Sequence, residues 1–140
     1  MEHKKNKIKM QFCRPTPALF DVLRRRPTAD AIQARLFGSV LTLRVPHLLD
    51  AEIAHVIRRH AAGGEIAPER GHELLRDLVD LPMQRHSHDW LLPRVWELRH
   101  NLTAYDALYV ALAEALDAPL VTRDGRLAAV PGHQAKVELV

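Results

Sequence analysis

Apolar and polar positions along the chain follow two patterns, a helical one and a strand-like one. Apolar residues three or four positions apart predict helices over residues 18–37 (interrupted near Pro27), 46–62, 68–81, 90–99, 103–116 and 126–129. Short apolar or β-branched runs bounded by turn residues predict strands over residues 40–45, 83–86, 119–122 and 136–140. Residues 1–10 are rich in lysine, and we expect them to be frayed.

Helices and strands alternate in this pattern, and the alternation determines the fold class that we predict. Pro46 opens one predicted helix and Gly63-Gly64 ends it, as expected from the helix preferences of proline and glycine. Short strands separated by helices are typical of an α/β fold in which helices flank a short parallel sheet. Ligands of such sheets bind outside the carboxyl ends of the strands, so polar residues at these ends are candidate site residues.

The composition is that of one ordinary globular domain. The chain has 140 residues, of which 47% are hydrophobic and 26% charged, and we treat residues 1–140 as a single domain. No apolar run approaches the roughly 18 residues that a membrane helix needs, and none follows the basic start, so we expect neither a membrane segment nor a secretory signal. The single cysteine, Cys13, cannot form an internal disulfide and fits the reducing cytoplasm.

The chain is basic, with a net charge of +3 and a sequence pI of about 9.4. This balance favours a polyanionic partner, of which nucleic acid is the usual one. The runs Arg24-Arg25-Arg26 and Arg58-Arg59 are equally compatible with solvated helix faces. Charge alone therefore leaves the partner open.

Asp106 is the most informative residue, because the helix predicted around it is otherwise free of charge until Glu114. A helix that is apolar nearly all round is buried, and a buried carboxylate is costly without hydrogen bonds or a cation. The alternative is a capping box, with Thr103 as the N-cap and Asp106 in the electropositive first turn. The two interpretations are compatible, since a first-turn aspartate can still face a cleft.

Glu52 and Asp124 are the other two candidate acids. Glu52 lies in an apolar sequence with no Lys or Arg four residues on, although an acid that interacts with the helix dipole is the alternative. Asp124 follows a predicted strand, and its alternative roles are an Asp-Gly turn or an N-cap. All three acids lie near strand ends or helix starts. Because Mg²⁺ prefers oxygen ligands, such a group favours metal-assisted hydrolysis of phosphodiesters.

Other candidate groups are weaker. The spacing of His86-Ser87-His88 is compatible with zinc, but two histidines without further ligands are more typical of a surface. Cys13 has no recognisable histidine partner, which argues against a thiol nucleophile. The chain has no glycine-rich phosphate-binding loop.

Three segments of the chain resemble the PIN domains of VapC toxins: residues 46–52 (PHLLDAE), 98–113 (LRHNLTAYDALYVALA) and 120–127 (LVTRDGRL). The middle segment is the most specific, and the resemblance covers residue 18 to the C-terminus. It implies a PIN-like α/β/α sandwich. It also implies a cytoplasmic ribonuclease of a toxin–antitoxin pair, which uses Mg²⁺ or Mn²⁺, is silenced by a partner antitoxin and forms a homodimer.

The resemblance also implies roles for individual residues. Glu52, Asp106 and Asp124 correspond to three of the family's four acids, which makes them candidate catalytic and metal-binding residues. Asp106 would be a direct metal ligand, and the other two would bind the metal directly or through water. Arg99 is a candidate for holding RNA phosphates.

The family's first acid is missing. Its first strand ordinarily ends in Asp, a small residue and Ser, and Pro15 and Pro17 stand at the Asp and Ser positions here. Two prolines make residues 13–17 a poor central strand, and Asp21 lies too far into the next helix to substitute. Codons for Asp-Ala-Ser read one base later can encode Thr-Pro-Ala, the sequence of residues 16–18. We therefore hypothesise a local frame change in residues 1–17, with weakened activity.

Two other functions stay open from the sequence alone. The first is a catalytically inactive PIN-like protein that binds RNA or its antitoxin, which Pro15 supports. The second is a phosphatase or a phosphate-accepting receiver domain, in which Asp124 is the only acid placed to accept a phosphoryl group at a strand end.

Overall fold

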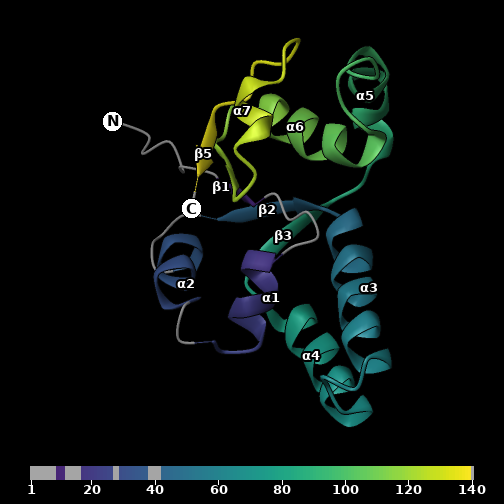
Figure 1. Ribbon diagram of the computed structural model, residues 1–140. Coiled ribbons are helices and arrows are strands. Elements are labelled where there is room, and N and C mark those ends of the chain that lie inside the picture. The colour runs from purple at the N-terminus through teal and green to yellow at the C-terminus, as the bar shows by residue number, and fades with distance from the viewer. Residues whose placement is uncertain (1–8, 12–16, 27–28, 38–41, 140) are drawn as a thin grey trace.

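Five short strands form one parallel sheet with helices on both faces in the computed structural model (Figure 1). The structure describes residues 9–11, 17–26, 29–37 and 42–139. The order across the sheet is β3-β2-β1-β4-β5, and each neighbouring pair is parallel. The predicted α/β fold is thus confirmed. The strands are β1 (Lys9–Gln11), β2 (Leu43–Pro46), β3 (Met83–His86), β4 (Leu120–Thr122) and β5 (Val137–Leu139).

The helices form two layers, one on each face of the sheet (Figure 1). The first layer consists of α1 (Pro17–Leu23), α2 (Asp30–Phe37), α3 (Leu48–Ala62) and α4 (Pro68–Asp80). The second layer consists of the 3₁₀ helix η2 (Asp89–Leu91) and the helices α5 (Leu92–Glu97), α6 (Ala104–Leu116) and α7 (Arg126–Ala129). No helix in the described part of the chain is long and apolar enough to cross a membrane.

Each helical layer packs on the sheet through its own apolar core. Leu43 and Val45 of β2 belong to the core with α1, α3 and α4. In β4, Leu120 belongs to the core with α6 and α7, whereas its neighbour Val121 belongs to the opposite core. Successive side chains of a strand point to opposite faces, so one short strand supports both layers. The order of layers is therefore helix, sheet, helix.

The structure corrects the prediction for the start of the chain. Residues 9–11 form the central strand of the sheet, where Met10 pairs with Arg44 on one side and Leu120 on the other. The expectation that residues 1–10 are frayed is therefore wrong for Lys9 and Met10. The predictions for Cys13, Pro15 and Thr16 fall outside the described residues.

Two further element boundaries differ from the predicted ones. Pro46 is the last residue of β2 and is paired with His86 of β3, so the predicted helix starts two residues later, at Leu48. The single helix predicted over residues 90–99 is divided into η2 and α5, with a proline in the first turn of α5. Both differences follow from proline, which lacks an N–H and therefore fits strand ends and first helical turns alike.

Candidate active site at the carboxyl edge of the sheet

The three predicted acids lie on elements that meet at the carboxyl edge of the sheet. Glu52 is on α3, which directly follows β2, and Asp124 lies two residues beyond the end of β4. Asp106 is in the first turn of α6, and α6 leads back to the start of β4. The N-terminus of a helix that returns to the start of a parallel strand lies near the carboxyl edge. The fold thus places all three acids at one edge.

Asp106 is buried, with only 4% of its surface exposed. The residues that follow it, from Ala107 to Ala113, are also buried, which confirms that α6 is apolar nearly all round. Thr103 is the N-cap, and its side-chain oxygen accepts a hydrogen bond from the backbone N–H of Asp106 at 3.2 Å. The predicted cap is therefore present and coexists with a buried carboxylate in the electropositive first turn of the helix.

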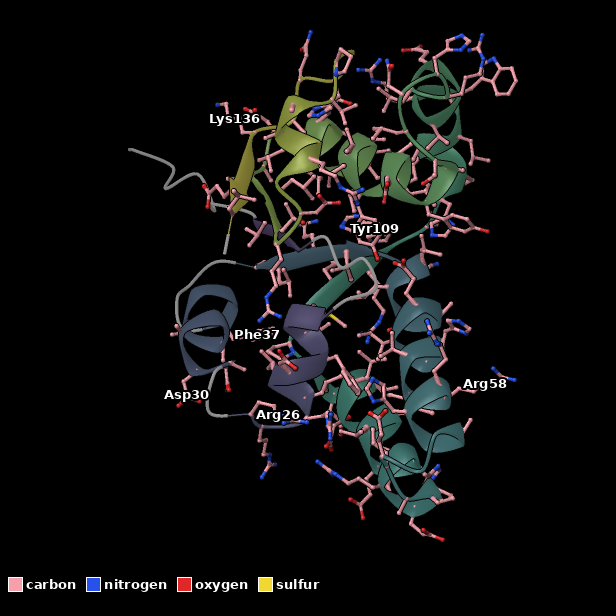
Figure 2. The ribbon with its side chains drawn as sticks, viewed as in Figure 1. Arg26, Asp30, Phe37, Arg58, Tyr109 and Lys136 are labelled. Carbon is pink, nitrogen blue, oxygen red and sulfur yellow. The ribbon has the colours of Figure 1, made fainter. Side chains whose placement is uncertain are left out.

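Glu52 is held by a residue that the sequence did not single out as functional. The hydroxyl of Tyr109 donates a hydrogen bond to the carboxylate of Glu52. Tyr109 is fully buried and lies one helical turn after Asp106, between α6 and the sheet (Figure 2). Residues three apart share one face of a helix, so this spacing was the available signal. Tyr109 thereby connects Glu52 of α3 to the face of α6 that carries Asp106.

Asp124 forms a compact turn with its neighbours. Its backbone N–H donates to the hydroxyl of buried Thr122 at 2.9 Å, and its carboxylate accepts from the backbone N–H of Arg126 at 3.0 Å. The guanidinium of Arg126 also donates to both carboxylate oxygens, each at 3.0 Å. The turn that was the alternative role for Asp124 is therefore present, together with a bidentate ion pair.

Arg126 is a cation that interacts with Asp124 and, at longer range, with Asp106. The hydrogen bond to Asp124 is the main reason that the pKa of Arg126 is raised, and the charge of Asp106 raises it further. The Arg126 side chain is 78% exposed, so solvent screens the pair and lets the side chain move away.

The described side chains do not form a ready-made metal centre. Within residues 9–11, 17–26, 29–37 and 42–139, no group of three or more His, Cys, Asp or Glu side chains is arranged to hold a metal ion. The predicted compact cluster of three carboxylates is therefore not observed there, and the metal-binding role of Glu52, Asp106 and Asp124 stays a prediction. Their carboxylate oxygens suit Mg²⁺ or Mn²⁺ chemically, provided that Arg126 releases Asp124.

Other residues considered from the sequence have structural contacts. Asp50 accepts a hydrogen bond from Arg85 of β3 at 2.7 Å, so it joins α3 to the sheet. Asp21 pairs with Arg123 at 3.2 Å, and whether it could substitute for the first acid is not tested by this contact. The guanidinium of Arg99 lies 4.3 Å from the ring centre of Trp96, and its role in holding phosphates stays a prediction.

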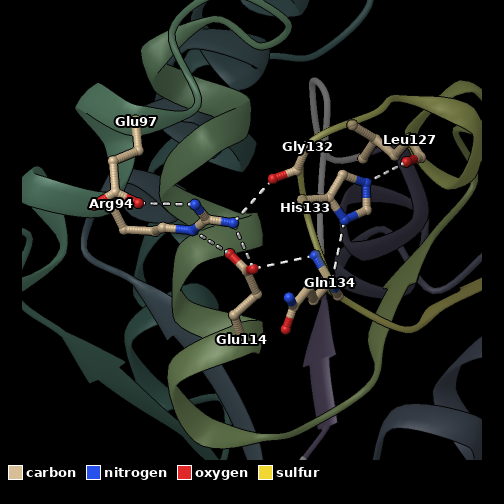
Figure 3. Close-up of polar contacts among 8 residues, drawn as sticks. Arg94, Glu97, Glu114, Leu127, Gly132, His133 and Gln134 are labelled. Carbon is tan, nitrogen blue, oxygen red and sulfur yellow. Dashed lines mark hydrogen bonds and ion pairs between the residues drawn. The ribbon is translucent and has the colours of Figure 1, made fainter.

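A polar network holds the loop that follows α7 (Figure 3). Arg94 of α5 donates to both carboxylate oxygens of Glu114 in α6, at 3.0 and 2.9 Å, and to the carbonyl of Gly132 at 3.0 Å. Glu114 also accepts from the backbone N–H of Gln134 at 3.1 Å. Between these contacts, the ring of His133 is hydrogen bonded to the carbonyl of Leu127 in α7 at 2.7 Å. The network therefore ties α5, α6 and the loop after α7 together.

Comparisons with known proteins identify the family. The PIN domain family matches residues 16–133. Ribonuclease VapC1 of Mycobacterium tuberculosis is 51% identical over 113 residues, which are 80% of this chain and 85% of that protein. Ribonuclease VapC12 of the same organism is 35% identical over 123 residues, or 88% of this chain and 94% of that protein. The chain therefore belongs to the PIN-domain family, and the resemblance to VapC proteins is confirmed.

Solved structures show the same fold. The VapBC2 structure from Rickettsia felis, bound to a DNA fragment from the promoter, matches with a TM-score of 0.71 and covers 95% of this chain and 98% of that chain. PAE2754 from Pyrobaculum aerophilum matches with a TM-score of 0.63 over 94% of this chain and 82% of that chain. Sequence identities to these chains are 16% and 19%, so the likeness concerns the fold.

Proposed function

We propose that this chain is the endoribonuclease toxin of a toxin–antitoxin pair and that it hydrolyses RNA phosphodiesters with Mg²⁺ or Mn²⁺. The observation that carries the proposal is the 51% identity to a protein named Ribonuclease VapC1 over 80% of the chain. The positions of Glu52 on α3, Asp106 on α6 and Asp124 after β4 support the same proposal. All three lie at the carboxyl edge of the sheet, where parallel sheets bind ligands. The basic charge of the chain agrees with an RNA substrate.

Each side chain of the candidate site has its own role in the proposed reaction. Buried Asp106 supplies a fixed negative charge, and Tyr109 orients the carboxylate of Glu52 towards the same face of α6. Arg126 is exposed, and a guanidinium released from Asp124 is suited to contact a phosphate of the substrate. A divalent cation, when bound by these carboxylates, supplies positive charge that polarises the phosphate.

Partners and location follow the same proposal. The fold shared with the VapBC2 structure supports an antitoxin as the protein partner. We further propose that the chain acts in the cytoplasm as a homodimer.

A cleavage assay on the purified protein tests the proposal. We expect single-stranded RNA to be cut with Mg²⁺ or Mn²⁺, to remain intact when a chelator is present, and to remain intact with Asp106→Asn. Glu69→Gln on α4, an exposed acid away from the site, is the matched control and should leave cleavage unchanged. Cleavage that persists equally in Asp106→Asn or in the chelator would contradict the proposed chemistry.

An inactive RNA-binding or antitoxin-binding protein is the second candidate. The bidentate pair between Arg126 and Asp124 favours it, because this pair occupies one of the three acids. Retention of RNA without any cleavage, with both metals tested, would support this candidate over the nuclease.

A further inference from the structure

Two histidines lie at the end of β3: the ring of His88 contacts the start of the helix that carries Glu52, and the ring of His86 contacts β2. The backbone N–H of Leu48, the first residue of α3, donates to Nε2 of His88 at 3.0 Å. The guanidinium of Arg44 in β2 contacts Nε2 of His86 at 3.2 Å. The backbone adds a third contact, from the N–H of His47 to the carbonyl of His86 at 2.8 Å. We call His86 and His88 the histidine pair.

The donors fix the protonation state of both rings. A backbone N–H and a guanidinium can only donate, so Nε2 of His86 and of His88 must each be an acceptor. Each ring is therefore neutral, with its proton on Nδ1. A proton added to either Nε2 replaces an acceptor with a second donor, and the contact with Leu48 or Arg44 is lost.

The surroundings of the histidine pair disfavour a positive charge. Burial is the largest cause that lowers the pKa of His86, followed by the charges of Arg44 and His47. Burial and then His47 lower the pKa of His88, whose ring centre lies 6.1 Å from that of His47. The nearby acid of η2, Asp89, accepts a hydrogen bond from Ser87 at 2.7 Å.

The contact at Leu48 is coupled to Glu52 through the helix itself. In an α-helix the C=O of residue 48 accepts the N–H of residue 52, so the peptide groups of Leu48 join His88 to the first turn of α3. The side-chain carboxylate of Glu52 in turn accepts a hydrogen bond from the hydroxyl of Tyr109 in α6. A shift in the start of α3 therefore changes the position of Glu52 relative to α6.

We propose that His88 is a positioning residue for Glu52, which holds the start of α3 against the end of β3 when neutral and releases it when protonated. The consequence for RNA cleavage rests on the proposed function, whereas the structural coupling does not. Acidification should loosen the first turn of α3 before the protein unfolds, and cleavage should fall with it.

Amide exchange measured by NMR tests the coupling without any RNA. We expect the Leu48 amide to be protected at pH 8 and to exchange at least several-fold faster, after correction for intrinsic rates, once His88 is protonated. His88→Gln keeps an acceptor near the position of Nε2 but does not titrate, so Leu48 should stay protected at both pH values. His88→Ala should lose this protection at both. His72→Gln, an exposed histidine of α4, is the matched control and should behave as the unchanged protein.

Cleavage rates then test the catalytic consequence. We expect the rate of His88→Gln relative to the unchanged protein to be close to one at pH 8 and to rise several-fold once the pH is low enough to protonate His88, which requires a pH below the ordinary histidine value of about 6.5 because its pKa is lowered. Equal pH profiles for the two proteins, or a Leu48 amide indifferent to pH and to His88→Gln, would overturn the proposal. If neither the unchanged protein nor any variant cleaves RNA, but exchange of the Leu48 amide depends on pH and on His88 as expected, the proposed function is contradicted. The link between His88 and the start of α3 is then still supported.

Discussion

At the scale of single residues, the sequence revealed the acids more readily than the groups that hold them. Asp106 was conspicuous because a charge interrupts an apolar helix, and the structure shows that it is buried. Tyr109 belongs to the same apolar run, where a tyrosine is easily interpreted as a core residue, yet its hydroxyl holds Glu52. Arg126 looked like an ordinary exposed residue, because pairing with Asp124 depends on the turn geometry. Local pattern identifies unusual charges, whereas partners depend on the fold.

Asp106→Asn distinguishes the role of the Asp106 charge in catalysis from the role of residue 106 in the helix cap. The cap depends on the backbone N–H of residue 106 and the hydroxyl of Thr103, which this change leaves in place. The free energy of unfolding should therefore fall by less than about 1 kcal/mol, while cleavage should fall by roughly 10²-fold or more. Thermal denaturation and RNA cleavage measure the two effects. A large loss of stability with activity retained would show that Asp106 serves the helix alone.

Tyr109→Phe tests whether the orientation of Glu52 matters. The phenyl ring fills the same buried space, so the cost in stability should be near that of one hydrogen bond, about 1 kcal/mol. Cleavage should fall roughly 10-fold, because Glu52 loses the donor that fixes it. Tyr105→Phe is the matched control on the same helix, since Tyr105 is exposed. Equal cleavage by the two variants would argue against a role for the Tyr109 hydroxyl.

At the scale of helices and strands, the hydrophobic pattern predicted which elements exist better than where they begin. The strand over residues 83–86 and the helix up to Leu116 are found at their predicted bounds. Pro46 was misplaced because a proline suits both a first helical turn and a strand end, and only pairing with His86 decides between them. The strand at Lys9–Gln11 was missed because its pairing to distant strands outweighs a lysine-rich sequence.

Arg94→Ala tests the network that joins α5, α6 and the loop after α7. The change leaves the half-buried carboxylate of Glu114 without its two guanidinium donors. We expect the free energy of unfolding to fall by about 1–3 kcal/mol. Arg58→Ala, an exposed arginine of α3 (Figure 2), should change it by less than about 0.5 kcal/mol. Equal stability of the two variants, measured by chemical denaturation, would contradict a supporting role for Arg94.

The same network predicts a pH dependence. Burial alone would raise the pKa of Glu114, but hydrogen bonds from Arg94 and from the N–H of Gln134 outweigh it and lower the pKa below the usual 4.5. A carboxylate with a lowered pKa adds stability above its unfolded pKa and loses it as the pH falls through the folded value. We therefore expect the unchanged protein to lose stability as the pH falls below about 4.5, and Glu114→Gln to lose less, when the two are compared by denaturation at several pH values.

At the scale of the whole molecule, the site exists only because the sheet brings distant segments together. Glu52, Asp106 and Asp124 are separated widely in sequence, and each alone had an ordinary structural explanation. The parallel sheet places the ends of β2 and β4 at the same edge, and α6 spans it from the other layer. The sequence could predict this edge from the alternation of elements. It could not predict that Arg126 pairs with Asp124 in the turn.

We predict that the proposed homodimer forms through the helices α3 and α4, and a pair of variants tests this interface. Val79 of α4 is 70% exposed, which leaves apolar surface on the predicted contact. Val79→Asp should therefore shift a dimer towards monomer in light scattering at micromolar concentration. Trp96→Asp, on the exposed surface of α5, is the matched comparison and should leave the dimer intact. A monomer in the unchanged protein, or a dimer broken only by Trp96→Asp, would contradict the predicted interface.

The missing first acid leads to the last prediction, which concerns the assembled site. Pro15 stands where the resemblance places an aspartate, which implies that the site lacks one negative charge and two carboxylate oxygens. Magnesium loses its water reluctantly and compensates poorly for a missing ligand, so we expect weak Mg²⁺ binding and slow cleavage in the chain as it stands. Pro15→Asp alone should restore little, because the rest of the segment before α1 still differs from the family's, and a carboxylate misplaced by about 1 Å can cost roughly 10²-fold in rate.

Rebuilding residues 11–17 as an apolar strand that ends in Asp-Ala-Ser should raise Mg²⁺ affinity and the cleavage rate together. The central position of β1 supports this design, because a strand already lies between β2 and β4 and can deliver a side chain to their shared edge. Calorimetry measures the affinity, and RNA cleavage with and without Mg²⁺ measures the rate. The same rebuilt segment with Asn in place of Asp is the matched control, since it changes the strand but not the charge. If the unchanged chain already binds Mg²⁺ as tightly and cuts RNA as fast as the rebuilt one, the first acid is dispensable in this protein.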